Sequence, residues 1–142
     1  ERDLALLFFD ERLTRARPLA TGTLTTDDIA RPLMALGYSE GLPRADGSVG
    51  APRVKVGVLS QLIDLGDSGI NLTMDAAIDP GESGGPVFNA RGEVVGMNRG
   101  FRTVTPDGLP VLGTFFALHV NDINTWYQTI RVFLSQQPPP AP

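Results

Sequence analysis

Apolar residues in this chain recur in short runs that are separated by segments rich in glycine and proline. Residues 54–63 alternate in part between apolar and polar side chains and are rich in β-branched residues, a pattern typical of a strand. By the same criteria we predict further strands at residues 33–38, 70–74, 87–88, 93–98 and 111–120. The pattern therefore predicts an all-β domain of about six short strands.

The segments between these runs carry turn signals. Residues 89–92 (Asn-Ala-Arg-Gly) predict a hairpin, and residues 105–108 (Thr-Pro-Asp-Gly) predict a second tight turn. Residues 39–51 are rich in glycine, serine and proline and are expected to form a loop. Residues 10–31 are expected to be a surface connection in which Thr26 or Asp27 caps one short helical turn.

Beyond residue 120 the spacing of apolar residues becomes helical, with Asn121 as a suitable N-cap. We expect Trp126 to dock this helix on the domain. The two ends differ from the rest: residues 4–9 predict an apolar strand, and residues 136–142 predict an extended polyproline spacer. We therefore expect the chain to begin part-way through a longer protein, with room for a further domain after the tail.

Composition narrows the classes of function. With 142 residues, 42% of them hydrophobic, the chain can bury the core of one domain. A net charge of −4 and a pI near 4.8 argue against a nucleic-acid partner, and the scattered arginines form no cluster for anionic lipid. The absence of cysteine excludes disulfides and thiolate metal sites, and we expect neither a metal nor a cofactor. No apolar run approaches the roughly 20 residues that span a bilayer.

Residues 79–86 (Asp-Pro-Gly-Glu-Ser-Gly-Gly-Pro) surround one serine with three glycines and two prolines. Glycine and proline disfavour both helix and regular strand, so this segment is expected to bend sharply. In acyl transfer, a serine hydroxyl attacks a carbonyl while two N–H groups hold the oxyanion that forms. Ser83 is then a candidate nucleophile, and the N–H groups of Gly81 and Ser83 are the candidate oxyanion hole.

The alternative is that Ser83 only forms a turn, as most serines in glycine-rich loops do. A nucleophile elbow is disfavoured, because the residues that follow Ser83 predict a strand, whereas the elbow requires a helix.

Residues 81–86 (Gly-Glu-Ser-Gly-Gly-Pro) resemble the serine loop of the trypsin-like (chymotrypsin-fold) serine proteases. The wider residues 71–89 and 91–98 resemble the bacterial HtrA/Deg branch, and the resemblance runs from residue 3 to about residue 126. It implies the second six-stranded β-barrel of a double-barrel fold, with a C-terminal helix. Residues 1–20 would hold the last strand of the first barrel and the crossover, residues 21–135 the second barrel with its helix, and residues 136–142 a proline-rich tail.

The resemblance also implies a serine endopeptidase that acts on protein or peptide substrates, in a periplasmic or secreted location. Asp3-Leu4-Ala5-Leu6-Leu7 matches the family segment that carries the triad aspartate, although alone Asp3 is an ordinary acid at a strand end. In the family role, Asp3 would accept the Nδ1–H of a histidine and steady its imidazolium. The family histidine precedes this aspartate.

The chain has one histidine, His119, which lies in the strand before the final helix and is expected to be structural. The catalytic histidine is therefore expected on an N-terminal barrel segment, or on a chain, outside these residues. Two alternatives remain open. The chain could be a catalytically inactive trypsin-fold module that binds peptides, or a structural adaptor tethered by its proline tail.

Two further features bear on the site. Glu82 stands where the HtrA branch usually has asparagine, and its carboxylate could either form an ion pair or bond locally to the backbone.

The resemblance places the floor of the specificity pocket at about Ala77 and Ile78, and the facing wall at Asn98, Arg99 and Gly100. With no acid at the floor, cleavage after small apolar residues is favoured over cleavage after lysine or arginine. Arg99 would attract acidic residues if it pointed inward, and would otherwise be solvated.

Overall fold

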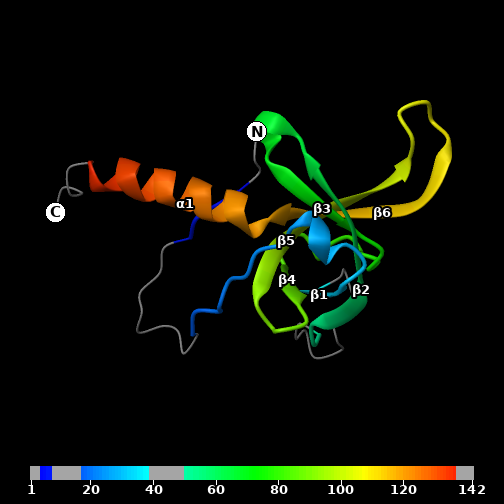
Figure 1. Cartoon of the computed structure of the whole chain (residues 1–142), viewed down its shortest axis with the longest axis horizontal. Coiled ribbons are helices and arrows are strands. Elements are labelled where there is room, and N and C mark those ends of the chain that lie inside the picture. The colour runs from blue at the N-terminus through cyan, green and yellow to red at the C-terminus, as the bar shows by residue number, and fades with distance from the viewer. Residues whose placement is uncertain (1–3, 8–16, 39–49, 137–142) are drawn as a thin grey trace.

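The structure is a computed structural model of the chain, and it describes residues 4–7, 17–38 and 50–136. The described residues form a mostly β fold of six strands followed by one α-helix (Figure 1). The elements are β1 (Pro32–Gly37), β2 (Arg53–Asp64), β3 (Ile70–Met74), β4 (Pro86–Asn89), β5 (Val94–Val104), β6 (Pro110–His119) and α1 (Val120–Ser135).

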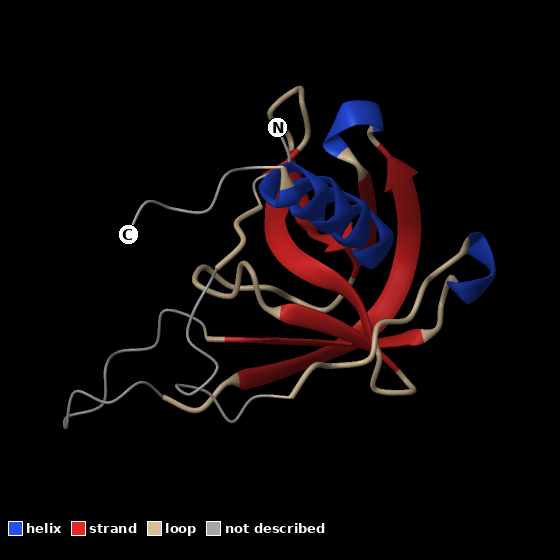
Figure 2. Cartoon of the chain, turned by 90° about the vertical axis from the view of Figure 1, so that its left-hand side faces the viewer, coloured by secondary structure: helices blue, strands red, loops and turns tan. Residues whose placement is uncertain are grey.

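The strands close into a barrel in the order β1-β2-β3-β6-β5-β4, and every neighbouring pair is antiparallel. The pairing of β1 with β4, which places Met34 opposite Phe88, completes the ring. Figure 2 shows the strands curling around a common interior, and Figure 1 shows α1 leading away from the barrel. The predicted six-stranded barrel with a C-terminal helix is confirmed.

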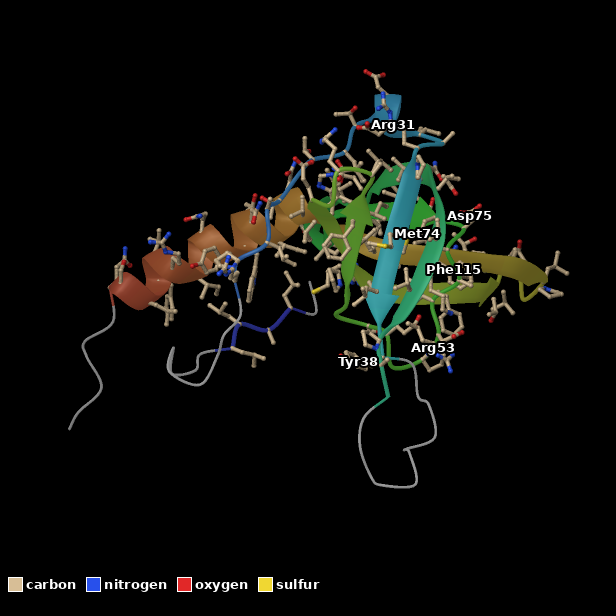
Figure 3. The ribbon with its side chains drawn as sticks, turned by 90° about the horizontal axis from the view of Figure 1, so that it is seen from below. Arg31, Tyr38, Arg53, Met74, Asp75 and Phe115 are labelled. Carbon is tan, nitrogen blue, oxygen red and sulfur yellow. The ribbon has the colours of Figure 1, made fainter. Side chains whose placement is uncertain are left out.

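Each strand contributes an apolar side chain to the barrel interior, because alternate residues of a strand face the same side. The buried residues from the six strands include Leu33, Leu59, Leu72, Val87, Val95 and Ala117. Met74 is 2% exposed; Figure 3 shows it between Arg31 and Tyr38, which lie just beyond the two ends of β1. Each fully buried leucine stabilises the fold by about 1.5–3 kcal/mol, so this interior holds the loops at the ends of the strands in place.

Some element boundaries differ from the predictions. β5 continues to Val104, because Gly100 and Arg102 still pair with β6, opposite Phe116 and Thr114. Arg99 and Gly100 interrupt the apolar pattern, which is why the sequence predicted an end at residue 98.

The predicted helix caps were wrong by one or two residues. The first short turn is a 3₁₀ segment, Thr26–Asp28, with Thr25 as its N-cap, and the Asp28 carboxylate accepts the Thr25 N–H at 2.8 Å. The N-cap of α1 is His119 rather than Asn121, because the His119 Nδ1 accepts the Asn121 N–H at 3.1 Å.

The helix α1 contacts β5 and β6, and Trp126 on it is partly buried. In the described part of the chain, no helix is both long enough and apolar enough to cross a membrane.

Residues 4–7 were predicted to belong to a strand, but they lie outside any strand. A strand needs a neighbour for its backbone hydrogen bonds, and no described strand pairs with this segment. Leu7 is 77% exposed. The remaining residues of that predicted strand, most of the predicted loop at residues 39–51, and the proline tail beyond Gln136 lie outside the described residues.

Candidate active site

The serine loop consists of two consecutive tight turns that share Glu82. In the first, the Glu82 N–H donates to the Asp79 carbonyl at 3.1 Å, with Pro80 second and Gly81 third at φ 92°. In the second, the Gly85 N–H donates to the Glu82 carbonyl at 3.2 Å, and the third residue, Gly84, has φ 84°. Glycine with positive φ at the third position is the pattern of a type II turn. The two turns place Ser83 at an exposed bend between two glycines.

The loop is anchored to the barrel on both sides. On one side, the Gly84 N–H donates to the Asn98 carbonyl and the Asn98 N–H donates to the Gly85 carbonyl, each at 2.8 Å. The buried Asn98 side chain donates from Nδ2 to the carbonyls of Leu36 and Glu82, each at 3.3 Å. On the other side, the Gly85 backbone approaches the Leu36 carbonyl so closely that a Cβ would overlap it. The loop therefore has a fixed position against β1 and β5.

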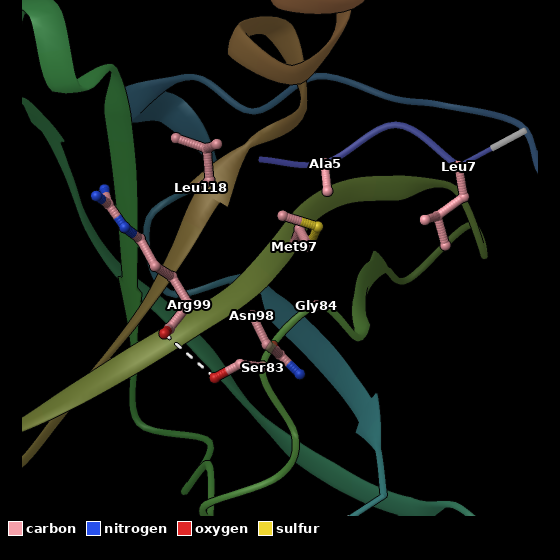
Figure 4. Close-up of a pocket in the computed structure, with 8 residues that line it drawn as sticks. All are labelled: Ala5, Leu7, Ser83, Gly84, Met97, Asn98, Arg99 and Leu118. Atoms are coloured by element: carbon pink, nitrogen blue, oxygen red, sulfur yellow. Dashed lines mark hydrogen bonds between the residues drawn. The ribbon is translucent and has the colours of Figure 1, made fainter. Parts of the chain in front are cut away.

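Ser83 lines a hollow of about 410 Å³ whose other walls include Ala5, Leu7, Met97 and Leu118 (Figure 4). Its hydroxyl donates to the Arg99 carbonyl at 3.3 Å. That carbonyl is available because the register of β5 against β6 shifts between Asn98 and Gly100, so Arg99 is the extra residue of a β-bulge. The hydroxyl of Ser83 thus has an exposed, apolar-walled space in front of it.

The two candidate oxyanion donors are not used by the fold. Among the hydrogen bonds of the described residues, none is donated by the Gly81 N–H or by the Ser83 N–H. Both residues are exposed. As far as the described residues go, these two amides are free to bind another acceptor.

Glu82 is buried, at 2% exposure. Its carboxylate forms both of the interactions that the sequence left open, a local hydrogen bond to the backbone and an ion pair. Oε2 accepts the Asp79 N–H at 2.9 Å, and it lies 3.9 Å from the Lys55 ammonium. Lys55 also lies 2.8 Å from the Asp79 carboxylate, and this hydrogen bond lowers the pKa of Asp79 below its ordinary value. Glu82 is therefore held by a local backbone donor and by a cation on β2.

Lys55 was not among the residues that the sequence predicted for the site. One signal was present, because Lys55 is the only lysine of the chain and every other basic residue except His119 is arginine.

His119 is buried and both of its ring nitrogens are used within the fold. Nδ1 accepts the Asn121 N–H at 3.1 Å, whereas Nε2 lies 3.2 Å from the Leu24 carbonyl oxygen and 3.3 Å from the Leu24 backbone nitrogen. The neutral tautomer with hydrogen on Nε2 satisfies the contacts with the Asn121 N–H and with the Leu24 carbonyl. Burial lowers the pKa of His119, which also favours this neutral form. The expected structural role of His119 is supported by these contacts.

The remaining predicted site residues are distributed as follows. Asp3 lies outside the described residues. Of the two predicted floor residues, Ala77 is exposed and Ile78 is buried in the barrel core, and neither lines the described hollow at Ser83. Asn98 lies beneath the loop, as described above. The roles of these residues in substrate binding and catalysis stay predictions.

The Arg99 side chain extends away from Ser83 (Figure 4), and its guanidinium donates to the Asn71 Oδ1 at 3.4 Å. Together with Gly100, Arg99 lines a neighbouring hollow of about 300 Å³. Arg99 is thus neither directed at Ser83 nor fully solvated. Within the described ranges, no group of three histidine, cysteine or acidic residues could hold a metal ion.

Comparison with known proteins gives consistent matches. The family model for the trypsin-like peptidase domain matches residues 1–97. The putative serine protease HhoA of Synechocystis sp. is 37% identical over 98 residues, which cover 59% of this chain and 25% of HhoA. The serine protease Do-like HtrB of Bacillus subtilis is 48% identical over 52 residues, which cover 37% of this chain and 10% of HtrB. The chain thus spans a quarter or less of these two relatives.

Solved structures match the same fold. The HtrA-type protease AlgW with a tripeptide aligns with a TM-score of 0.57 at 25% identity, over 79% of this chain and 35% of that one. The structure of Rv3671c from M. tuberculosis aligns with a TM-score of 0.59 at 20% identity, over 87% of this chain and 57% of that one. The second likeness concerns the fold alone.

Proposed function

Since this chain belongs to the family of trypsin-like peptidase domains, we propose that it is the nucleophile-bearing part of an HtrA-type serine endopeptidase. The observation that carries the proposal is the serine loop. Ser83 lies at an exposed bend, beside a hollow, and in the same turn pair the amides of Gly81 and Ser83 donate no hydrogen bond to another described residue. If Ser83 only formed a turn, nothing would require the N–H groups of Gly81 and Ser83 to be without acceptors.

In the proposed reaction, the Ser83 Oγ attacks the carbonyl carbon of a substrate peptide bond, and the carbonyl π electrons move onto its oxygen. The N–H groups of Gly81 and Ser83 stabilise this oxyanion, and one such donor contributes about 2.7–4 kcal/mol to lowering the barrier. The Ser83 proton passes to a histidine from outside this chain and then to the departing amine. The C–N bond breaks as the amine departs, which leaves the acyl group on Ser83. Water then gives a proton to the histidine and attacks the acyl carbon, and the proton returns to the Ser83 Oγ as the acid product leaves.

Before this attack, the Ser83 hydroxyl must turn away from the Arg99 carbonyl. At 3.3 Å that hydrogen bond is long for an O–H donor, so its loss costs little. An imidazole placed in the hollow beside Ser83 would replace the Arg99 carbonyl as the acceptor.

The position of residues 4–7 supports Asp3 as the orienting carboxylate. Ala5 and Leu7 follow Asp3 by two and four residues, and both line the hollow that contains Ser83. The segment after Asp3 therefore lies beside the nucleophile. The imidazole that Asp3 would orient comes, in this proposal, from an N-terminal barrel segment or chain.

The proposed substrates are proteins or peptides. AlgW, which shares the fold, is described with a tripeptide, and this supports a peptide as the ligand class. The preference for a small apolar residue before the scissile bond stays a prediction.

The activity is tested by peptide hydrolysis with the intact protein that contains this chain. We expect Ser83→Ala to lower kcat by about a thousandfold or more. The matched control is Ser60→Ala, which removes an exposed hydroxyl on β2 and should leave kcat unchanged. If the intact protein has an upstream histidine but binds peptides without hydrolysing them, the inactive binding module is the correct function.

A further inference from the structure

The ammonium of Lys55 contacts both ends of the first turn of the serine loop. Its Nζ lies 2.8 Å from the Asp79 Oδ2 and 3.9 Å from the Glu82 Oε2. Asp79 and Glu82 are the first and last residues of that turn, and the Gly81 amide lies between them. Lys55 comes from β2, twenty-four residues before Asp79, where it pairs with Ala35 of β1. One side chain of the barrel wall therefore bridges the turn.

The burial of the Glu82 carboxylate calls for a nearby cation, which Lys55 supplies. A buried carboxylate is strongly unfavourable unless a cation and hydrogen-bond donors compensate for its lost hydration. Glu82 is 2% exposed, its Oε2 accepts the Asp79 N–H, and its Oε1 has no hydrogen-bond partner among the described residues. In the described part of the chain, Lys55 is the one cation within 4 Å of it. Without Lys55, the buried Glu82 carboxylate would have no cation within 4 Å among the described residues.

The backbone of the first turn can change conformation easily. Gly81 has φ 92°, and glycine adopts positive and negative φ about equally well. The peptide unit between Pro80 and Gly81, which carries the proposed oxyanion donor, is therefore fixed mainly by what holds the ends of the turn. Those ends are held by the turn's own hydrogen bond, by the Glu82 carboxylate, by the ion pair with Asp79, and, at Glu82, also by the bond from Asn98 Nδ2 to its carbonyl.

We propose that Lys55 is a positioning residue that holds the Gly81 N–H in its oxyanion-binding orientation by clamping Asp79 and Glu82. This inference rests on the proposed function. A lysine suits the role because its ammonium is a compact point charge that can lie between two carboxylates, whereas arginine offers a planar fork.

Arg53 supplies a matched control. It lies two residues before Lys55 on β2, its side chain is 56% exposed, and its guanidinium lies 3.6 Å from the same Asp79 oxygen. No ion pair within the described residues joins Arg53 to Glu82. Removing Arg53 therefore weakens the charge around Asp79 but leaves the buried carboxylate paired.

The test compares Lys55→Met and Arg53→Met in the intact protein that contains this chain. For Lys55→Met we expect the rate of fluorophosphonate labelling at Ser83 and the kcat for a peptide substrate to fall at least about tenfold, with KM changed less than about threefold. Arg53→Met should stay within about twofold of the wild type, and Lys55→Arg should recover part of the loss. Equal losses in Lys55→Met and Arg53→Met, or none in either, would overturn the clamp.

A second measurement does not depend on catalysis. The Glu82 N–H closes the turn, and its hydrogen exchange should be at least about tenfold faster in Lys55→Met than in Arg53→Met. If the fluorophosphonate does not label the wild-type protein, the proposed function is wrong. The hydrogen exchange of the Glu82 N–H still tests the clamp in that case, because equal exchange rates in Lys55→Met and Arg53→Met would overturn it. If Lys55→Met does not fold, the double variant Lys55→Met/Glu82→Gln replaces it, because it removes the buried Glu82 charge together with the Lys55 ammonium. In this double variant, the N–H of residue 82 should also exchange at least about tenfold faster than in Arg53→Met.

Discussion

At the scale of single residues, the site depends on glycines whose missing side chains admit other groups. Gly81 and Gly84 have positive φ and form the two turns, whereas Gly85 is needed for space, because its Cα lies against the Leu36 carbonyl. The serine loop thus requires glycine for two separate physical reasons. Only the first is visible as a turn signal in the sequence.

Replacement of Gly85 tests the close approach to β1. We expect Gly85→Ala to destabilise the protein by about 1–3 kcal/mol, because the added Cβ overlaps the Leu36 carbonyl and displaces the loop. The measurement is the midpoint of urea unfolding. Gly50→Ala is the control, since an added Cβ there has no neighbour within 4 Å among the described residues. A Gly85→Ala protein as stable as Gly50→Ala would show that the loop is not packed against β1.

His119 gives the fold a dependence on pH. Burial lowers its pKa in the folded state below the ordinary value of about 6.5, so the unfolded chain binds the proton more readily. The stabilisation from neutral His119 is therefore complete above about pH 6.5, and it is lost as the pH falls through the folded-state pKa.

Melting temperatures between pH 8 and pH 5 check this dependence. We expect the wild type to lose stability below pH 6.5 more steeply than His119→Asn, which keeps an acceptor for the Asn121 N–H but does not titrate. Both proteins share the carboxylates that also titrate at low pH, so only the difference between them reports on His119. Parallel curves would mean that His119 is not buried in its neutral form.

At the scale of elements, the helix and the barrel are joined at a polar contact. The Asp122 carboxylate, in the first turn of α1, accepts the Ile70 N–H at the start of β3 at 2.7 Å. Gly69, with φ 82°, brings the chain close to Asp122 at this point. The β-bulge at Arg99 has a comparable effect in β5, where it directs a backbone carbonyl at Ser83 and a side chain at Asn71. Irregular positions, more than regular strands, thus set the local geometry.

Removal of the Asp122 carboxylate should loosen the contact between α1 and β3. We expect Asp122→Ala to cost about 1–2 kcal/mol of unfolding free energy, because the partly buried Ile70 N–H loses its acceptor. Asp107→Ala, which changes an exposed acid in the turn between β5 and β6, should have little effect. If the two variants melt together, Asp122 does not hold the helix to the barrel.

At the scale of the whole molecule, local signals predicted the strands, whereas the closed barrel was implied by the family resemblance. Apolar runs and glycine-containing turns are short-range features, and they predicted about six strands and the hairpin at residues 89–92, which joins β4 to β5. The motif around Ser83 likewise predicted a bent loop between β3 and β4, and the loop is present.

Features that depend on distant pairing were not predicted. The extension of β5 to Val104 comes from its register with β6, the His119 cap from packing against Leu24, and the Lys55 contact from the position of β2 against the serine loop. Apart from Lys55 being the only lysine of the chain, none of these features leaves a signal in the sequence. The pocket floor at Ala77 and Ile78 came from resemblance, and the described hollow at Ser83 is lined by other residues.

The most direct test of the central claim is the position of the covalent adduct that a fluorophosphonate leaves on the intact protein. Attack by the serine Oγ on phosphorus expels fluoride and leaves one phosphonyl group, which peptide mapping by mass spectrometry locates. We expect a single adduct on Ser83, formed in the wild type and absent from Ser83→Ala. An adduct on another residue, or none in a protein that supplies the upstream histidine, would contradict the assignment of Ser83 as nucleophile.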